Sequence, residues 1–301
     1  MQNIDNLISS AIQNDQVNEL LDKFGLNWKV EKTPLLLPNG NETPYFALVR
    51  SDNGGILNSV KDSYVPYQNS ELADLIIKIA DKGGYSIHSG GSFNGGAKQY
   101  LQLNSGNEIQ SIGENRSKVK GFVTGINSHD GTTALKFGSV NFTICCRNTF
   151  AAAGKSLQNS VKHTTSMHDK VDEYLQQIGI VIKQETAIFD QFITMAEIPV
   201  TKELIRNVVK EITKVDTMLT PSQAKEQFTT YQINRSNELL QSIATEMHSK
   251  GQTRWGLFSG VTHYTSHVMP IPKREAARIE SKYTGTGLTT DNTIFKMLSV
   301  N

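Results

Sequence analysis

The chain has 301 residues, of which 38% are hydrophobic and 20% charged, and its formal net charge is +1. This composition is that of an ordinary globular protein, and no apolar run approaches the roughly 18 residues of a membrane-spanning helix, which excludes a membrane protein. The length fits one large domain or two smaller ones.

The first part of the chain predicts one helix, several short strands and a second helix. From Ile4 to Phe24 apolar residues recur every three or four positions, which indicates an amphipathic helix that ends at Gly25. A second helix is expected from Asn69 to Lys82, closed by Gly83 and Gly84. Short extended runs bounded by turn residues predict strands at 28–30, 35–37, 45–50, 56–60, 85–89, 98–103, 121–126, 133–137 and 141–146.

After Asn148 the pattern becomes helical and stays so. Helices are predicted at 167–178, 184–195, 201–212, 222–250, 254–267, 273–281 and 291–298. Strands followed by helices are typical of an α+β fold with an N-terminal antiparallel sheet region and a mostly helical C-terminal half. We expect a β-rich region over 1–165 and a helical region over 166–301 packed on it, an arrangement that a single domain would also satisfy.

Charge is distributed unevenly along the chain. Residues 115–170 contain eight Lys or Arg against two Asp or Glu, a net charge of +6, whereas residues 1–114 contain eight against thirteen, a net charge of −5. A basic segment in a nearly neutral protein is the pattern that a phosphate-binding surface leaves. The predicted phosphate contacts are Arg116, Lys118, Lys120, Lys136, Arg147, Lys155 and Lys162.

Aromatic side chains accompany these basic residues. Phe93 stands at the centre of the Gly-rich segment 89–96, which reads as a flexible loop or a plain hairpin connection, and in a loop its ring could stack on a nucleobase. Phe122, Phe137, Phe142 and Phe150 are interleaved with the basic segment, and some of them must belong to the core.

The segment Ser128-His129-Asp130-Gly131 contains the residue types of a catalytic triad. Neighbouring residues of one strand point to opposite faces, so contiguous side chains cannot converge on one reacting atom, and Asp130-Gly131 is better explained as a hairpin turn. An alternative is that His129 and Asp130 meet His163 from a separate strand to form a hydrolytic or metal site. We treat these three residues as weak catalytic candidates, and favour a protein that is not an enzyme.

No metal site and no cofactor are expected. His263 and His267 have the i, i+4 spacing that lets two imidazoles share a metal, but Tyr264 stands where a metalloprotease carries its glutamate. No Walker phosphate-binding loop is present, because Gly154-Lys155-Ser156 lacks the preceding glycine. The two cysteines, Cys145 and Cys146, are adjacent, which makes a disulfide between them strained. With no secretory signal in residues 1–6, the expected location is the cytoplasm of the host cell.

Several short stretches resemble a known family, the phage/plasmid-like proteins catalogued as domain of unknown function 932. The stretches are Val60–Asn69, Asn127–Gly131, Cys146–Thr149, His163-Thr164 and Trp255–Tyr264. The resemblance spans about residues 55 to 285. It implies a phage or plasmid context, which favours DNA replication, recombination or host takeover, and it implies no mechanism.

These observations favour a nucleic-acid-binding protein that binds or anneals single-stranded DNA in replication or recombination. Lys and Arg side chains would track the phosphate backbone along an antiparallel sheet. Two alternatives stay open: the enzyme with a His129, Asp130 and His163 site, and a phage assembly or host-interaction protein that uses the C-terminal helices. A homo-oligomer is compatible with the first function, although no heptad pattern specifies one.

Overall fold

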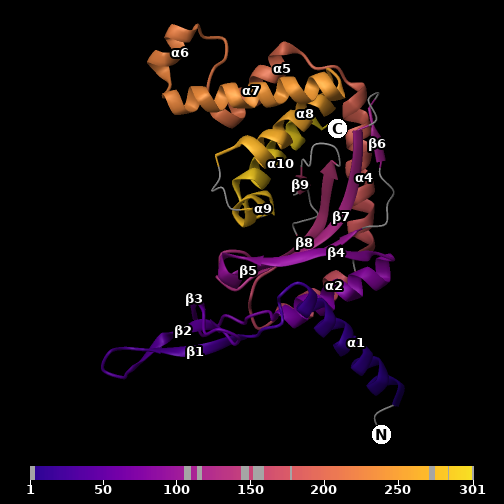
Figure 1. The fold of residues 1–301 in the computed structure, drawn as a ribbon, viewed down its shortest axis with the longest axis vertical. Helices are drawn as coiled ribbons and strands as arrows, with labels where there is room; N and C mark the ends of the chain where they lie inside the picture. Colours follow the sequence, from indigo (N-terminus) through magenta and orange to yellow (C-terminus); the bar gives the residue numbers. More distant parts are fainter. Residues whose placement is uncertain are drawn as a thin grey trace. The chain divides into compact units, whose positions relative to one another are not determined.

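A computed structural model describes residues 4–104, 110–113, 117–143, 149–151, 159–176, 178–270, 275–283 and 285–299 (Figure 1). The chain divides into two compact units. Unit 1 contains residues 1–106, 122–139 and 155–182, and unit 2 contains residues 107–121, 140–154 and 183–301. The predicted α+β class is confirmed, since antiparallel strands and a few helices precede a mostly helical C-terminal half. The predicted division after residue 165 stays a prediction.

The strands form two sheets. In the smaller sheet, β1 (Val30–Leu36), β2 (Glu42–Arg50) and β3 (Ile56–Lys61) pair in sequence order and antiparallel. The larger sheet has the strand order β10-β8-β7-β5-β4, while β6 pairs with β7 and β9 with β8. Its strands are β4 (Ser86–Phe93), β5 (Lys98–Asn104), β6 (Gln110–Ile112), β7 (Ser117–Ser128), β8 (Leu135–Thr143), β9 (Thr149–Ala151) and β10 (Asn159–Val161).

Two strand predictions need correction. The strands expected at 133–137 and 141–146 are parts of one strand, β8, which continues through Gly138. The Gly-rich segment expected to be a loop mostly belongs to β4, which pairs with β5 as far as Phe93. A Cβ at residue 90 would lie 2.5 Å from Leu101 Cδ2 and 2.8 Å from Phe24 Cδ2, so any other residue there would require these side chains to shift.

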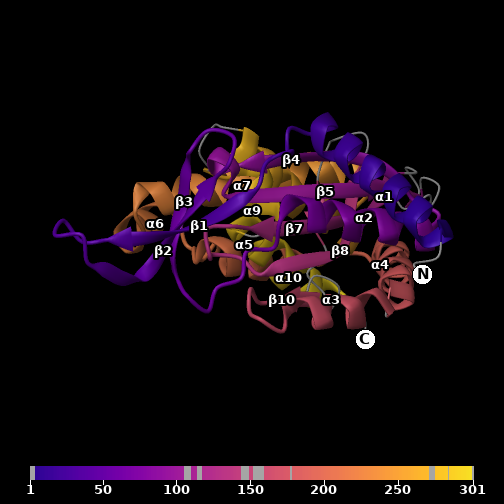
Figure 2. The same ribbon diagram turned by 90° about the horizontal axis from the view of Figure 1, so that it is seen from below.

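Unit 1 contains the helices α1 (Ile4–Lys23), α2 (Asn69–Gly83) and α3 (Met167–Gln176). Helix α2 begins with a capping box between Gln68 and Glu71, and it ends at Gly84, whose positive φ of 65° suits glycine. Figure 2 shows α2 lying across one face of the large sheet, with α1 beside it.

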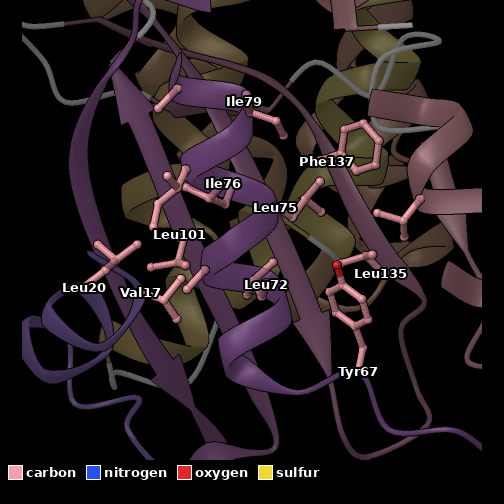
Figure 3. Packing of buried hydrophobic residues seen from close by; sticks show 14 of the residues in the cluster. Val17, Leu20, Tyr67, Leu72, Leu75, Ile76, Ile79, Leu101, Leu135 and Phe137 are labelled. Atoms are coloured by element: carbon pink, nitrogen blue, oxygen red, sulfur yellow. The ribbon is translucent and has the colours of Figure 1, made fainter. Parts of the chain in front are cut away.

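The core of unit 1 lies between α2 and this face of the sheet (Figure 3). Alternate strand residues point toward the helix, which presents its own apolar face, as the period-2 and period-3.6 patterns require. Burying a Leu or Ile side chain contributes about 1.5–3 kcal/mol. The buried residues that meet here include Leu72, Leu75, Ile76 and Ile79 of α2 and Leu101, Leu103, Val123, Leu135 and Phe137 of the sheet.

Unit 2 is mostly helical. Its helices are α4 (Ile178–Glu197, of which residues 178–182 belong to unit 1), α5 (Lys202–Thr213), α6 (Pro221–Gln227), α7 (Thr230–Lys250), α8 (Arg254–His263), α9 (Glu275–Tyr283) and α10 (Thr286–Leu298). The single helix predicted at 222–250 is wrong. The helix is interrupted at Phe228, whose backbone is extended, and α7 then begins with a capping box between Thr229 and Gln232.

The core of unit 2 contains a group of aromatic rings among aliphatic side chains. Phe192 packs near Trp255 and Phe258, with ring centroids 4.9 and 5.9 Å apart. Helix α8 passes close to α7 and continues into one π-helical turn, Tyr264–Val268. A buried ion pair joins Lys282 to Asp291. Within the described ranges, no helix combines the length and the apolar character needed to cross a membrane.

Candidate functional site

Two of the predicted phosphate-contacting lysines lie on β7 in unit 2. Lys118 is exposed and Lys120 is half-buried, whereas Val119 between them is only 1% exposed. Because strand side chains alternate between faces, both lysines project from the face opposite to Val119. This part of β7 therefore presents a pair of basic side chains and hides its apolar one.

Two further lysines lie together in unit 1. Ser160 on β10 pairs with Lys136 on β8, and Val161 pairs with Leu135. Opposed residues share a face, so Lys162, just beyond β10, lies on the same face as Lys136 and diagonal to it. Lys162 is exposed and Lys136 half-buried, while Leu135, Phe137 and Val161 are buried on the other face.

Three of the predicted basic contacts, Arg116, Arg147 and Lys155, lie outside the described residues, and so do Cys145 and Cys146. The side chains of Phe142 and Phe150 lie outside them as well. Phe122 and Phe137 are buried, in agreement with the expectation that some of the interleaved phenylalanines belong to the core.

The role predicted for Phe93 requires correction. Its ring is 4% exposed and stacks on Tyr100, with centroids 5.1 Å apart and 2° between the ring planes. Both side chains lie on the same face of the β4–β5 pair, where Phe93 is opposite Lys98. A ring held in this way offers no exposed face to a nucleobase, so Phe93 is not a candidate contact.

His129 is fully buried in unit 1, and its Nε2 lies 3.1 Å from Asn69 Oδ1. Asn69 Nδ2 donates to the carbonyls of Leu26 and Trp28, so Asn69 Oδ1 faces His129 and accepts a hydrogen bond from it. The ring proton of His129 is therefore on Nε2. This leaves His129 Nδ1 with a lone pair and no hydrogen-bond partner among the described residues. Burial, with His163 as the next cause, lowers the pKa of His129 to about 3, although Asp130 acts in the opposite direction.

His163 comes from a distant segment of unit 1 and is held in a similar way. Its Nδ1 donates to the carbonyl of Val65 over 3.2 Å, and its ring stacks on Tyr64 with centroids 4.9 Å apart. Burial lowers the pKa of His163, whereas the carbonyls of Val65 and Thr133 and the carboxylate of Asp130 raise it. His163 Nε2 is a second buried nitrogen without a hydrogen-bond partner in the described part of the chain.

Tyr64 links these segments. Its hydroxyl donates to the carbonyl of Ser128 over 3.0 Å. Burial, followed by the negative charge of Asp130, raises the pKa of Tyr64 well above its usual value. The phenol therefore stays protonated and serves as a hydrogen-bond donor.

Asp130 occupies the predicted turn between β7 and β8. Its Oδ1 accepts from the amide of Thr132 over 2.9 Å and from the hydroxyl of Thr132 over 2.6 Å, and Gly131 has the positive φ of 70° expected of it. The connection extends over residues 129–134, which is longer than the tight turn that the dipeptide predicts. The side chain of Ser128 exchanges two hydrogen bonds with the backbone of Thr133 and so holds the two ends of this loop together.

His129, Asp130 and His163 thus lie within electrostatic reach of one another in unit 1. They do not form a Ser-His-Asp triad, because the hydroxyl of Ser128 donates to the carbonyl of Thr133 over 2.7 Å. In the described part of the chain, no three His, Cys, Asp or Glu side chains gather in a way that could hold a metal ion. Chemically, the cluster offers two neutral imidazole lone pairs beside one carboxylate.

No residue pattern in the sequence marks Tyr64 or Asn69 as functional, although they position the two histidines. Their signal is the family resemblance, since both residues lie in the stretch Val60–Asn69 that carries it. Three of the resembling stretches, which include Tyr64, His129 and His163, therefore meet at this cluster.

A family model described as "Domain of unknown function (DUF932)" matches residues 56–286, which is more than half of the chain. No curated protein and no solved structure matches significantly.

Proposed function

Since the chain belongs to the DUF932 family, whose function is unknown, we propose a function from its own residues: it binds single-stranded nucleic acid, preferably DNA. The observation that carries this proposal is that four lysines are exposed or half-buried while their apolar strand neighbours are buried. The lysines are Lys118, Lys120, Lys136 and Lys162, and the buried neighbours are Val119, Leu135, Phe137 and Val161. Sheet alternation thus directs the basic side chains away from the core in each unit.

Phosphate contacts dominate this mode of binding. Each lysine that neutralises a phosphate releases a condensed counterion, so affinity falls steeply with salt and depends little on base sequence. With Phe93 buried, stacking contributes less than the sequence suggested. A protein that contacts the phosphate backbone without reading the bases is suited to protecting or annealing single strands in replication and recombination.

The test is a titration of a labelled single-stranded oligonucleotide, read by fluorescence anisotropy between about 50 and 200 mM salt. Binding should weaken steeply over this range. In the double variants Lys118→Glu/Lys120→Glu and Lys136→Glu/Lys162→Glu, we expect weaker binding and a salt slope that is shallower by about 0.7 per lost phosphate contact.

Lys202→Glu/Lys225→Glu is the matched control, because both lysines are exposed, lie on α5 and α6, and change the net charge equally. It should leave most of the affinity intact. Absent or salt-independent binding, or equal losses in the control and both test variants, would overturn the proposal.

A second candidate function, acid–base catalysis at the histidine cluster, is favoured by the convergence of His129, Asp130 and His163 from separate segments. Running the same titration samples on a denaturing gel tests whether the protein cleaves the oligonucleotide. An intact oligonucleotide excludes nuclease activity, whereas cleavage that disappears in the His163→Gln variant supports it.

A further inference from the structure

Unit 1 contains a cleft of about 480 Å³ bordered by residues of α1, α2 and α3. Its apolar lining includes Val17, Leu75 and Val171, and its polar lining includes Asn14 and Ser70. A cleft of this size is in the range that accommodates small molecules. It involves neither the lysines nor the histidine cluster described above.

Two carboxylates of α2 face this cleft. Glu71 and Asp74 are three residues apart, so their side chains lie on the same side of the helix. Glu71 is fixed in place, because one oxygen lies 2.6 Å from His168 Nε2 and the other accepts from the backbone amide of Gln68 over 2.6 Å. Asp74 lies 2.7 Å from the ammonium of Lys78 and also accepts from the side-chain amide of Gln13.

The partners of these carboxylates are more exposed than the carboxylates themselves. The side chains of His168 and Lys78 are 54% and 44% exposed, against 33% and 32% for Glu71 and Asp74. Ion pairs of such exposure contribute about 0–1 kcal/mol, so a cation from solution can replace the lysine. The contact between Asp74 and Lys78 already shows an ammonium bound at this wall of the cleft.

We propose that the cleft binds a small aliphatic amine. Its ammonium group takes the position of Lys78 Nζ on Asp74 and is attracted to Glu71, and its carbon chain packs on Val17 and Leu75. The lining carries the two carboxylates of Glu71 and Asp74 and one lysine ammonium, that of Lys78, which favours a cation and disfavours an anion. The oxygens of Asn14 and Ser70 offer further acceptors for the remaining ammonium protons.

Three probes that share a four-methylene chain and differ only in their end groups test this chemistry by calorimetric titration at constant ionic strength: putrescine, 1,4-butanediol and adipate. Putrescine should bind saturably to one site per chain, while the diol and the dianion should not bind. Equal binding of the diol, or no saturable binding of putrescine, would overturn the proposal.

Variants of α2 locate the site. Asp74→Asn and Glu71→Gln should each weaken putrescine binding about tenfold or more, since a charged hydrogen bond is lost, and a glutamine side chain at position 71 preserves the capping box. Asp81→Asn, an exposed carboxylate of the same helix that does not line the cleft, is the matched control and should change nothing.

Lys78→Met gives the sharpest result. If the amine replaces Lys78 on Asp74, removing the competing ammonium should tighten putrescine binding. Unchanged or weaker binding in this variant, in a chain whose melting temperature is preserved, would contradict the proposed position. The Lys136→Glu/Lys162→Glu variant should bind putrescine normally, so this proposal and the nucleic-acid proposal can fail separately.

Discussion

The buried histidines make the stability of unit 1 sensitive to acid. The folded-state pKa of His129 is about 3 and that of His163 is also lowered, whereas an unfolded histidine titrates near 6.5. Between these values the unfolded chain binds more protons, so the stabilisation is present above about pH 6.5 and is lost as the pH falls. From about pH 7.5 to pH 5, we expect His129 alone to lower the free energy of unfolding by roughly 2 kcal/mol.

Urea unfolding at the two pH values measures this loss of stability. The His129→Gln variant shows how much of the loss comes from His129. The variant should be less stable at neutral pH, yet its free energy of unfolding should change less with pH. His88, which is exposed, provides the control, because His88→Gln should keep the full pH dependence. A variant at residue 129 with the pH dependence of the parent chain would refute the assignment.

At the scale of single residues, the sequence predicted the accessibility of some side chains but not of others. Lys118 and Lys136 alternate with apolar residues, so their outward placement follows from strand periodicity alone. Phe93 stands among glycines, and nothing local shows that Tyr100 on the paired strand covers its ring. The meeting of His129 with Asn69 depends on contacts across sixty residues of sequence, which no local pattern encodes.

At the scale of elements, the close contact between α7 and α8 depends on two glycines. A Cβ at Gly260 would lie 2.4 Å from the Cα of Ile243, and one at Gly256 would lie 2.1 Å from the carbonyl oxygen of Gly251. Both obstacles are backbone atoms, which cannot rotate aside. We therefore expect Gly260→Ala to lower the free energy of unfolding by at least about 2 kcal/mol, as measured by chemical denaturation, although alanine favours helices.

Gly125→Ala is the informative comparison for this prediction. The nearest atom to a Cβ there is the tip of the Ile76 side chain, at 2.9 Å, and a side-chain tip can give way. Its cost should be smaller than that of Gly260→Ala, and the opposite order would show that backbone proximity does not govern the α7–α8 contact. The stretch Trp255–Tyr264, which carries part of the family resemblance, is therefore interpreted as a helix-packing motif.

Element types were more predictable than element boundaries. Apolar spacing identified α2 and α5 closely, because an amphipathic helix packed on one side has a regular period. The break between α6 and α7 was missed because Thr229 and Gln232, which form the capping box, look like ordinary surface residues of a longer helix. β8 was divided at Gly138 because glycine was read as a boundary, although a paired strand tolerates it.

At the scale of the whole molecule, the order of strands and helices was sufficient to predict the α+β class. The assignment of segments to units was harder, because the chain passes between the units several times. α3 follows the predicted boundary at residue 165 and would have been grouped with the later helices. Its residues Met167 and Val171 instead belong to the core cluster of unit 1, together with Leu75 and Leu135.

Met167→Ala tests where α3 belongs. Met167 is fully buried, so the cavity should lower the free energy of unfolding by about 2–5 kcal/mol. Hydrogen exchange measured by mass spectrometry should then accelerate in α2 and β5 of unit 1, while α7 and α8 of unit 2 keep their protection, because local stability follows the contacts of each unit.

The control is Asp169→Ala, at an exposed position of the same helix, which should change neither the free energy of unfolding nor the exchange rates. Faster exchange in α7 and α8 alone would place α3 with the later helices, and equal acceleration throughout would mean that the chain unfolds as one cooperative domain.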